Sequence, residues 1–233
     1  MPRKNNPKET VERIITAAMQ LFHEKGFDKT SMQDIIDVSD ISKGAIFYHF
    51  ASKEEIFEAA MERRYEYVTN MMRDWLAGME GQSAKEKLIA LVKKNVDDNE
   101  MTAENEKMMA IGVVSPHLIL AHMKRNVAKG APILSKIIRE GITDGSIVTD
   151  YPEEAAELFL HLLNYWCDPV LFECDISTVR RRLDCFQQIM KNLGVDIVTD
   201  ELIEVSMRMT ENVYSAILEQ RQNEKTEGAE NNG

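Results

Sequence analysis

Apolar residues recur every three or four positions along most of the chain, the spacing of one buried face of an α-helix. The first stripe predicts a helix over about residues 8–25 and consists of Val11, Ile14, Ile15, Ala18, Leu21 and Phe22. A longer stripe predicts a helix from Ser52 to about Ala77. Later stripes predict further helices over about residues 83–96, 115–128, 130–145, 153–167, 175–193 and 200–222. We therefore expect an almost entirely helical protein.

Two short helices are predicted between the first helix and Ser52. Thr30 and Gln33 have the spacing of a capping box, which predicts a helix from Ser31 to Val38. A tight turn follows at residues 39–41, and Ser42 then caps a helix over Lys43–His49. Two short helices that are separated by a turn and braced by a preceding helix form the helix-turn-helix pattern.

Residues 8–57 resemble the N-terminal domain of the TetR family of bacterial transcriptional regulators. The resemblance is carried by residues 17–18, 21–22, 26–32 (Gly-Phe-Asp-Lys-Thr-Ser-Met), 34–36, 38–50 (Val-Ser-Asp-Ile-Ser-Lys-Gly-Ala-Ile-Phe-Tyr-His-Phe) and 52–57. It implies an all-α fold with a helix-turn-helix DNA-binding domain at residues 1–53. A long fourth helix would join this domain to a larger effector-binding and dimerisation domain, residues 54–222. Residues 223–233 hold no large apolar side chain, and we expect them to be disordered.

The predicted DNA-reading element is the third helix, since a helix in the major groove presents its first turn to the bases. Lys43 supplies charge there, Gly44 and Ala45 allow close approach, and Ile46 and Phe50 face the core. Tyr48 and His49 can donate hydrogen bonds to phosphates, whereas Phe47 offers an apolar contact where the family often has Tyr. Helix starts can also bind phosphates. The predicted contacts are Thr30, Ser31, Ser42, Lys43, Gly44, Ala45, Phe47, Tyr48, His49 and Lys53.

Each of these residues also has a simpler interpretation. Ser31, Ser42 and Ser52 are helix caps whether or not DNA is bound. Lys53 has the character of a solvated surface lysine. The aromatic run at residues 47–50 is typical of a core as much as of an interface.

The charge is unevenly distributed. The whole chain has a formal net charge of −11, but residues 1–53 hold eight Lys and Arg against seven Asp and Glu. We call residues 1–53 the head. Because a head with this charge balance makes few phosphate contacts, we expect two heads to act together, as a homodimer on palindromic double-stranded DNA. The acidic remainder would repel DNA.

A small-molecule effector is expected among the middle helices. The candidate lining residues are Tyr65, Met71, Met72, Met108, Met109, His161, Tyr165 and Trp166. Methionines adapt to irregular apolar ligands, although side chains at helical spacing are more often core. The dimer face is expected from helix 153–167 and the two helices after it, with intrachain core as the alternative.

The function predicted from these features is ligand-responsive transcriptional regulation, most simply repression, by a cytoplasmic protein without a cofactor. Residues 1–6 show no apolar core of the kind found in a signal peptide, which is the basis for the expected cytoplasmic location. The chain has no stretch of eighteen apolar residues and no P-loop, GxSxG, GxGxxG or HExxH motif. His117 and His122 are five residues apart, so they do not form a metal-binding face. Three cysteines without a CxxC pair are expected to be small buried side chains, with a redox sensor as the alternative. A helical module that no longer reads DNA and an all-helical enzyme are the other two classes.

Overall fold

The computed structural model describes residues 7–97, 116–169, 171–172 and 174–212, and these residues form helices and no strands. The all-α prediction is therefore confirmed. The chain divides into two compact units. The first comprises Met1–Gly78 with Lys107–Ile119, and the second comprises Met79–Glu106 with Leu120–Gly233. This division keeps the whole fourth helix with the first unit, whereas the sequence analysis places a boundary after residue 53.

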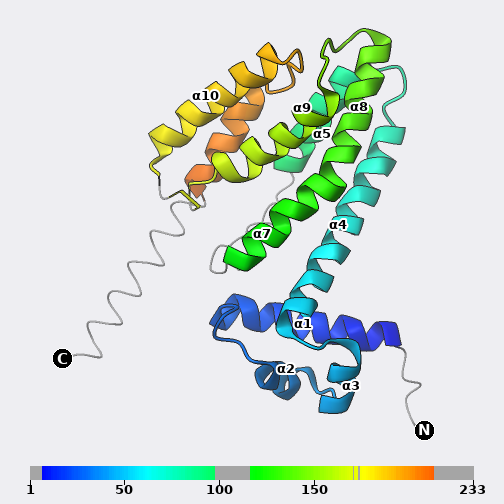
Figure 1. The fold of residues 1–233 in the computed structure, drawn as a ribbon, viewed down its shortest axis with the longest axis vertical. Helices are drawn as coiled ribbons and strands as arrows, with labels where there is room; N and C mark the ends of the chain where they lie inside the picture. Colours follow the sequence, from blue (N-terminus) through cyan, green and yellow to red (C-terminus); the bar gives the residue numbers. More distant parts are fainter. Residues whose placement is uncertain (1–6, 98–115, 170, 173, 213–233) are drawn as a thin grey trace, which may run out of the picture. The chain divides into compact units, whose positions relative to one another are not determined.

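The first unit is built on four helices whose bounds lie within about a residue of the predicted ones. They are α1 (Pro7–Lys25), α2 (Met32–Ser39), α3 (Lys43–His49) and α4 (Lys53–Ala77). In Figure 1, α2 and α3 are the two short helices beside α1, and α4 is a long helix that leads away from α1. α1 packs against both α2 and α4. α1 therefore contacts both the helix-turn-helix and the long fourth helix.

One apolar core joins these four helices. Phe22, Ile35, Ile46 and Ile56 come from α1, α2, α3 and α4 in turn, and each is at most 1% exposed. Gly26 ends α1 with a left-handed φ of 84°, as its position predicts. The ring of Phe27, which follows, lies 4.8 Å from that of Phe22. Leu118, in the first turn of α7 (Pro116–Arg125), belongs to the same core.

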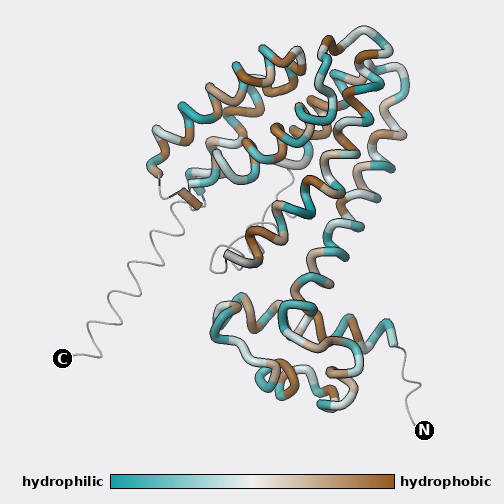
Figure 2. The backbone as a smooth tube through the Cα atoms, in the orientation of Figure 1, coloured by the Kyte–Doolittle hydropathy of each residue, from teal (hydrophilic) through white to brown (hydrophobic). Residues whose placement is uncertain are grey.

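The second unit is a layered helical bundle. α8 (Ala131–Asp144) packs against α5 (Ala84–Asp97) and α9 (Pro152–His161), and a further helix begins at residue 200 and is described as far as 212. The ring of Phe159 on α9 lies 5.3 Å from that of Phe186 on α10 (Ile176–Asn192). Figure 2 shows hydrophobic positions returning along these helices, as the sequence periodicity predicts. The apolar stripes of α9 and α10 are thus used at least partly within one chain.

Two π-helical turns interrupt the regular helices in the described part of this unit. η1 (Asn126–Gly130) links α7 to α8 where the sequence predicts a break, and η2 (Leu162–Trp166) continues α9. A π turn accommodates an extra residue and occurs frequently at functional sites. η1 packs against α9, and a Cβ atom at Gly130 would lie 3.0 Å from Leu160 Cδ1. The glycine therefore permits this close packing.

The cysteines only partly match the expectation of burial. Cys167 is buried, and burial raises the pKa of its thiol to about 12. Cys174 is partly exposed and Cys185, on α10, is exposed, so the prediction of burial is wrong for Cys185. Met108, Met109, the predicted tail and the predicted end of the last helix lie outside the described residues.

The burial of α3 in the core predicts how a substitution at Ile46 changes the stability of the protein. Ile46→Ala should lower the free energy of unfolding by about 2–5 kcal/mol, since Ile46 is fully buried and its truncation leaves a cavity. Val38→Ala, on the neighbouring helix, is the matched control because Val38 is 50% exposed. Denaturant unfolding followed by circular dichroism measures both changes. Equal losses for the two variants would contradict this packing.

Candidate functional site

α3 has one buried face and one exposed face. The Ala45 N–H donates to Ser42 Oγ at 3.3 Å, so Ser42 caps the helix as predicted. Ile46 is 0% and Phe50 8% exposed, which confirms that they face the core. Tyr48 is 84% exposed. The remaining predicted contacts that lie on the outside of α3 are Lys43, Gly44 and Phe47.

The exposed face of α3 combines a lysine ammonium group, aromatic rings and, at Gly44, a backbone position without a side chain. Lys43 Nζ lies 6.0 Å from the centre of the Phe47 ring, and the Tyr48 and His49 rings meet edge-on at 5.0 Å. A Cβ atom placed on Gly44 would meet no described atom within 4 Å. Packing among the described residues therefore does not require glycine at this position. Its effect is to leave the backbone open to approach from outside.

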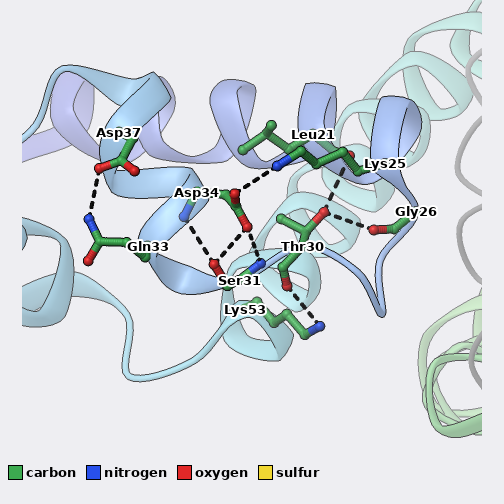
Figure 3. Close-up of polar contacts among 9 residues, drawn as sticks. All are labelled: Leu21, Lys25, Gly26, Thr30, Ser31, Gln33, Asp34, Asp37 and Lys53. Atoms are coloured by element: carbon green, nitrogen blue, oxygen red, sulfur yellow. Dashed lines mark hydrogen bonds and ion pairs between the residues drawn. The ribbon is translucent and has the colours of Figure 1, made fainter.

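The cap of α2 differs from the predicted one. Ser31, not Thr30, is the N-cap, and Asp34 takes the role expected of Gln33 (Figure 3). The Ser31 backbone N–H donates to Asp34 Oδ2 at 2.8 Å, and the Asp34 N–H donates to Ser31 Oγ at 3.1 Å. Lys25 Nζ lies 2.7 Å from Asp34 Oδ1. The lysine and serine hydrogen bonds hold the pKa of Asp34 well below its usual range.

Thr30 is placed inside the first unit. Its side chain is 1% exposed, and its hydroxyl donates to the Gly26 carbonyl at 2.8 Å (Figure 3). A phosphate contact from this side chain, as the sequence analysis predicts, is therefore not available in this structure. The threonine instead ties the start of α2 to the end of α1.

Lys53 has an internal role that the sequence does not reveal. Its ammonium donates to the carbonyls of Phe27, Asp28 and Thr30 at 2.7, 3.1 and 2.9 Å. The same nitrogen lies 4.6 Å from the centre of the Phe27 ring. All three ammonium protons thus have protein acceptors. The interpretations as a phosphate ligand and as a solvated lysine are both replaced by a clamp between the first turn of α4 and the α1–α2 loop.

The turn between α2 and α3 is held by a second cation, Arg13 of α1. Its Nη2 donates to the carbonyls of Ser39 and Asp40 at 2.9 and 3.2 Å. Asp40 has a left-handed φ of 53°, a conformation that aspartate tolerates better than most residues. The periodicity of α1 places Arg13 beside the buried Ile14 but gives no sign of its partner.

The predicted effector residues fall in different places. Tyr65, Met71 and Met72 are partly buried on α4 of the first unit. In the second unit, the rings of His161 and Tyr165 lie 5.8 Å apart, and Tyr165 is 5% exposed. Trp166 is next in the chain, with the Arg182 guanidinium 5.7 Å from its ring.

A polar network surrounds Tyr165. Its hydroxyl lies 2.9 Å from His122 Nδ1 and accepts a hydrogen bond from Asn126 Nδ2 at 2.8 Å. Burial lowers the pKa of His122 and raises that of Tyr165. His122 and Asn126 were not predicted as effector residues, because no sequence pattern joins positions about 40 residues apart.

Within the described ranges, no helix has the length and apolarity needed to cross a bilayer. The same residues contain no group of three or more His, Cys, Asp or Glu side chains arranged to hold a metal ion.

Comparison with known families places the chain by sequence. The family described as bacterial regulatory proteins, tetR family, matches residues 14–60, and a tetracyclin repressor-like C-terminal domain matches residues 94–189. The IcaR negative regulator of the Staphylococcus aureus icaADBC biofilm operon is 38% identical over 61 residues, which are 26% of this chain and 33% of IcaR. The Bacillus subtilis regulator YerO is 39% identical over 80 residues, 34% of this chain and 28% of YerO. The chain thus spans about a third of the length of the curated relatives it matches.

Solved structures share the fold. A TetR-family regulator from Syntrophomonas wolfei aligns with a TM-score of 0.61 and 21% identity, over 89% of this chain and 96% of its own. RolR, solved in complex with resorcinol, aligns with a TM-score of 0.57 and 16% identity, over 88% and 96%.

Helix order and core together define an all-α protein with an N-terminal helix-turn-helix. Since the two family matches together span more than half of the sequence, the chain belongs to the TetR family of bacterial regulatory proteins.

The Lys53 clamp predicts a loss of stability on its removal. Lys53→Met should lower the free energy of unfolding by about 1–3 kcal/mol, because charge-assisted hydrogen bonds to three carbonyls are lost. Lys29→Met, at an exposed position in the α1–α2 loop, is the control and should change it little. Denaturant unfolding distinguishes the two. An unchanged midpoint for Lys53→Met would argue that the clamp contributes nothing.

The Asp34 cap predicts a dependence on pH. Because the folded pKa lies below the unfolded value of about 3.9, the stabilisation is fully present above the unfolded pKa and is lost as the pH falls toward the folded one. The gap in unfolding free energy between the wild type and Asp34→Asn should therefore close as the pH is lowered from about 6 to about 2. Asp37→Asn, which retains an acceptor for Gln33, provides the comparison. A gap that stays constant over this range would contradict the interpretation.

Proposed function

We propose that the protein is a ligand-responsive DNA-binding transcriptional regulator, a repressor that binds a palindromic operator as a homodimer and is released by a small molecule. The observation that carries the proposal is the division of α3 into two faces. Ile46 and Phe50 fix the helix to the core, while Lys43, Gly44 and Tyr48 remain exposed on a rigidly held surface.

The exposed face of α3 suits the major groove. Lys43 and the open backbone at Gly44 belong to the first turn, which such helices present to the base edges. Ala45 can contact a thymine methyl, and Phe47 adds apolar surface. Tyr48 and His49, at the end of the helix, can donate to phosphates. Ser31 and Ser42 add exposed hydroxyls at the starts of α2 and α3, although both already act as caps.

The charge of the head supports pairing of two chains. Residues 1–53 carry an excess of only one basic residue, so a single head neutralises few phosphates. Two heads on a two-fold axis double these contacts and select a palindrome. Leu158, Leu162 and Leu163, which are partly exposed on α9 and η2, are the proposed contribution of this region to the dimer face.

Repression and release draw support from two sources. IcaR, which matches the head, is named a negative transcriptional regulator, and RolR, which shares the fold, was solved with a bound small aromatic molecule. α4 starts at the Lys53 clamp and extends over 25 residues, so a displacement along it would move the head. Effector and operator would then oppose each other by linkage. Chromosomal DNA as the partner implies a cytoplasmic location.

The test uses a duplex recovered from a random pool by the purified protein. Lys43→Ala and Tyr48→Phe should each weaken binding to it by about 1–3 kcal/mol, or roughly 5- to 150-fold, if each removes a specific contact. Lys136→Ala and Tyr67→Phe are matched controls at exposed positions outside the head's reading face, and they should leave the affinity unchanged. Fluorescence anisotropy at fixed salt measures all four variants.

Titration of the same duplex should saturate at two chains per site. Saturation at one chain would contradict the dimer. Equal affinity of the Lys43 and Tyr48 variants and the wild type would favour the alternative of a helical module whose head does not read DNA.

A further inference from the structure

The two π-helical turns of the second unit bring together polar groups from distant parts of the chain. Asn126 opens η1 and His122 lies four residues before it, while Tyr165 lies within η2 and His161 directly precedes η2. The rings of both histidines lie close to that of Tyr165, at 5.9 Å for His122 and 5.8 Å for His161. We call these four residues the Tyr165 cluster. Helices seldom contain a π turn, and here both of them supply members of one cluster.

The hydrogen bonds of the cluster run in one direction. The Asn126 amide can only donate through Nδ2, so the Tyr165 oxygen accepts from it. The Tyr165 hydroxyl is then directed to donate to His122 Nδ1. This order requires a neutral His122, and burial favours that form by lowering the pKa of the imidazole. Three members of the cluster therefore satisfy one another without a formal charge.

The fourth member, His161, lacks a hydrogen bond at one ring nitrogen. His161 Nδ1 is buried and has no hydrogen-bond partner among the described residues. A buried polar atom without a partner is costly, so native proteins rarely retain one without a reason. The cluster is not sealed, since His122, Asn126 and His161 are each partly exposed around the buried Tyr165. The cluster therefore borders the protein surface, while Nδ1 itself is covered by neighbouring atoms.

We infer that the Tyr165 cluster is an effector-recognition site that takes an uncharged hydroxyl-bearing molecule and pairs the hydroxyl with His161 Nδ1. The inference rests on the proposed function for the word effector, while the binding site itself does not depend on DNA. A hydroxyl both donates and accepts, so it satisfies Nδ1 in either tautomer of the imidazole. The surrounding aromatic rings add apolar contact surface for a small aromatic alcohol.

Charge selects against other ligands. A carboxylate or an ammonium would be transferred into a partly buried site whose polar members are already paired without charge, which is unfavourable.

The test uses benzyl alcohol as the probe on the full-length protein, followed by ligand-observed NMR titration. Anisole, benzylamine and benzoate are probes of similar size that lack the hydroxyl or carry a charge. We expect benzyl alcohol to bind with a Kd on the order of a millimolar, as a ligand of about eight heavy atoms allows. The other three probes should bind about tenfold more weakly or not at all.

Three variants locate the site. His161→Phe retains a ring but removes Nδ1, and it should weaken alcohol binding about tenfold. His161→Asn retains a donor and an acceptor near the same place and should bind within about threefold of the wild type. His23→Phe, on the exposed surface of α1, is the matched control. Thermal unfolding checks that each variant is folded.

Several results would overturn the inference. They are full binding by His161→Phe, loss of binding in His161→Asn, absence of alcohol binding to the wild type, and equal binding of any of the other three probes. The effector role is tested separately with the selected duplex. Saturating benzyl alcohol should weaken operator binding by about fivefold or more in the wild type but not in His161→Phe.

An unchanged operator affinity would overturn the effector role and leave the DNA-binding proposal intact. Conversely, His161-dependent alcohol binding by a protein that selects no duplex would support the site and overturn the proposed function.

Discussion

A helix of seven residues is not stable by itself in water, and the first unit is organised around this constraint on α3. The buried side chain of Ile46 fixes the helix to a core that also receives α1, α2 and α4. Ser42 supplies the cap, while Lys53 on α4 and Arg13 on α1 hold the loops on either side of α2 to the longer helices. Because one face of α3 is anchored in this way, its other face is presented in a fixed orientation, which is the requirement for reading a groove.

Much of the fold could be predicted from the sequence, because stripes and caps are local signals. The stripe through Ile14 and Phe22 defines α1, and Gly26 marks its end. The π turns could not be predicted in this way, since an extra residue in a turn is fixed by packing such as that of Gly130 against Leu160. The predicted N-cap of α2, Thr30, is one residue before the observed N-cap, Ser31. The side chains of both residues are suitable caps, and the burial of Thr30 decides between them.

The sequence also predicts which residues of the candidate site are exposed on α3, but not the contacts that side chains make with distant parts of the chain. The exposed residues of α3 follow from helical spacing and from the resemblance of residues 8–57. The sequence gives the identity of Lys53 but not the direction of its side chain, which turns inward to carbonyls about 25 residues earlier in the chain. Of the Tyr165 cluster, the sequence analysis predicts His161 and Tyr165 but not His122 and Asn126, because contacts between distant parts of the chain leave no local pattern. His161 and Tyr165 share one helical stretch, whereas His122 of α7 and Asn126 of η1 join them only through hydrogen bonds to Tyr165 of η2.

The most direct measurement of the central claim is the set of sequences that the purified protein recovers from a random pool of DNA duplexes at moderate salt. The account predicts an inverted repeat whose half-sites are separated by about one helical turn of DNA, or a whole multiple of it, as two copies of α3 on a two-fold axis require. It also predicts that a protein carrying Lys43→Ala recovers this sequence poorly. A pool that shows no enrichment over bulk genomic competitor, or enrichment that is independent of α3, would contradict the account.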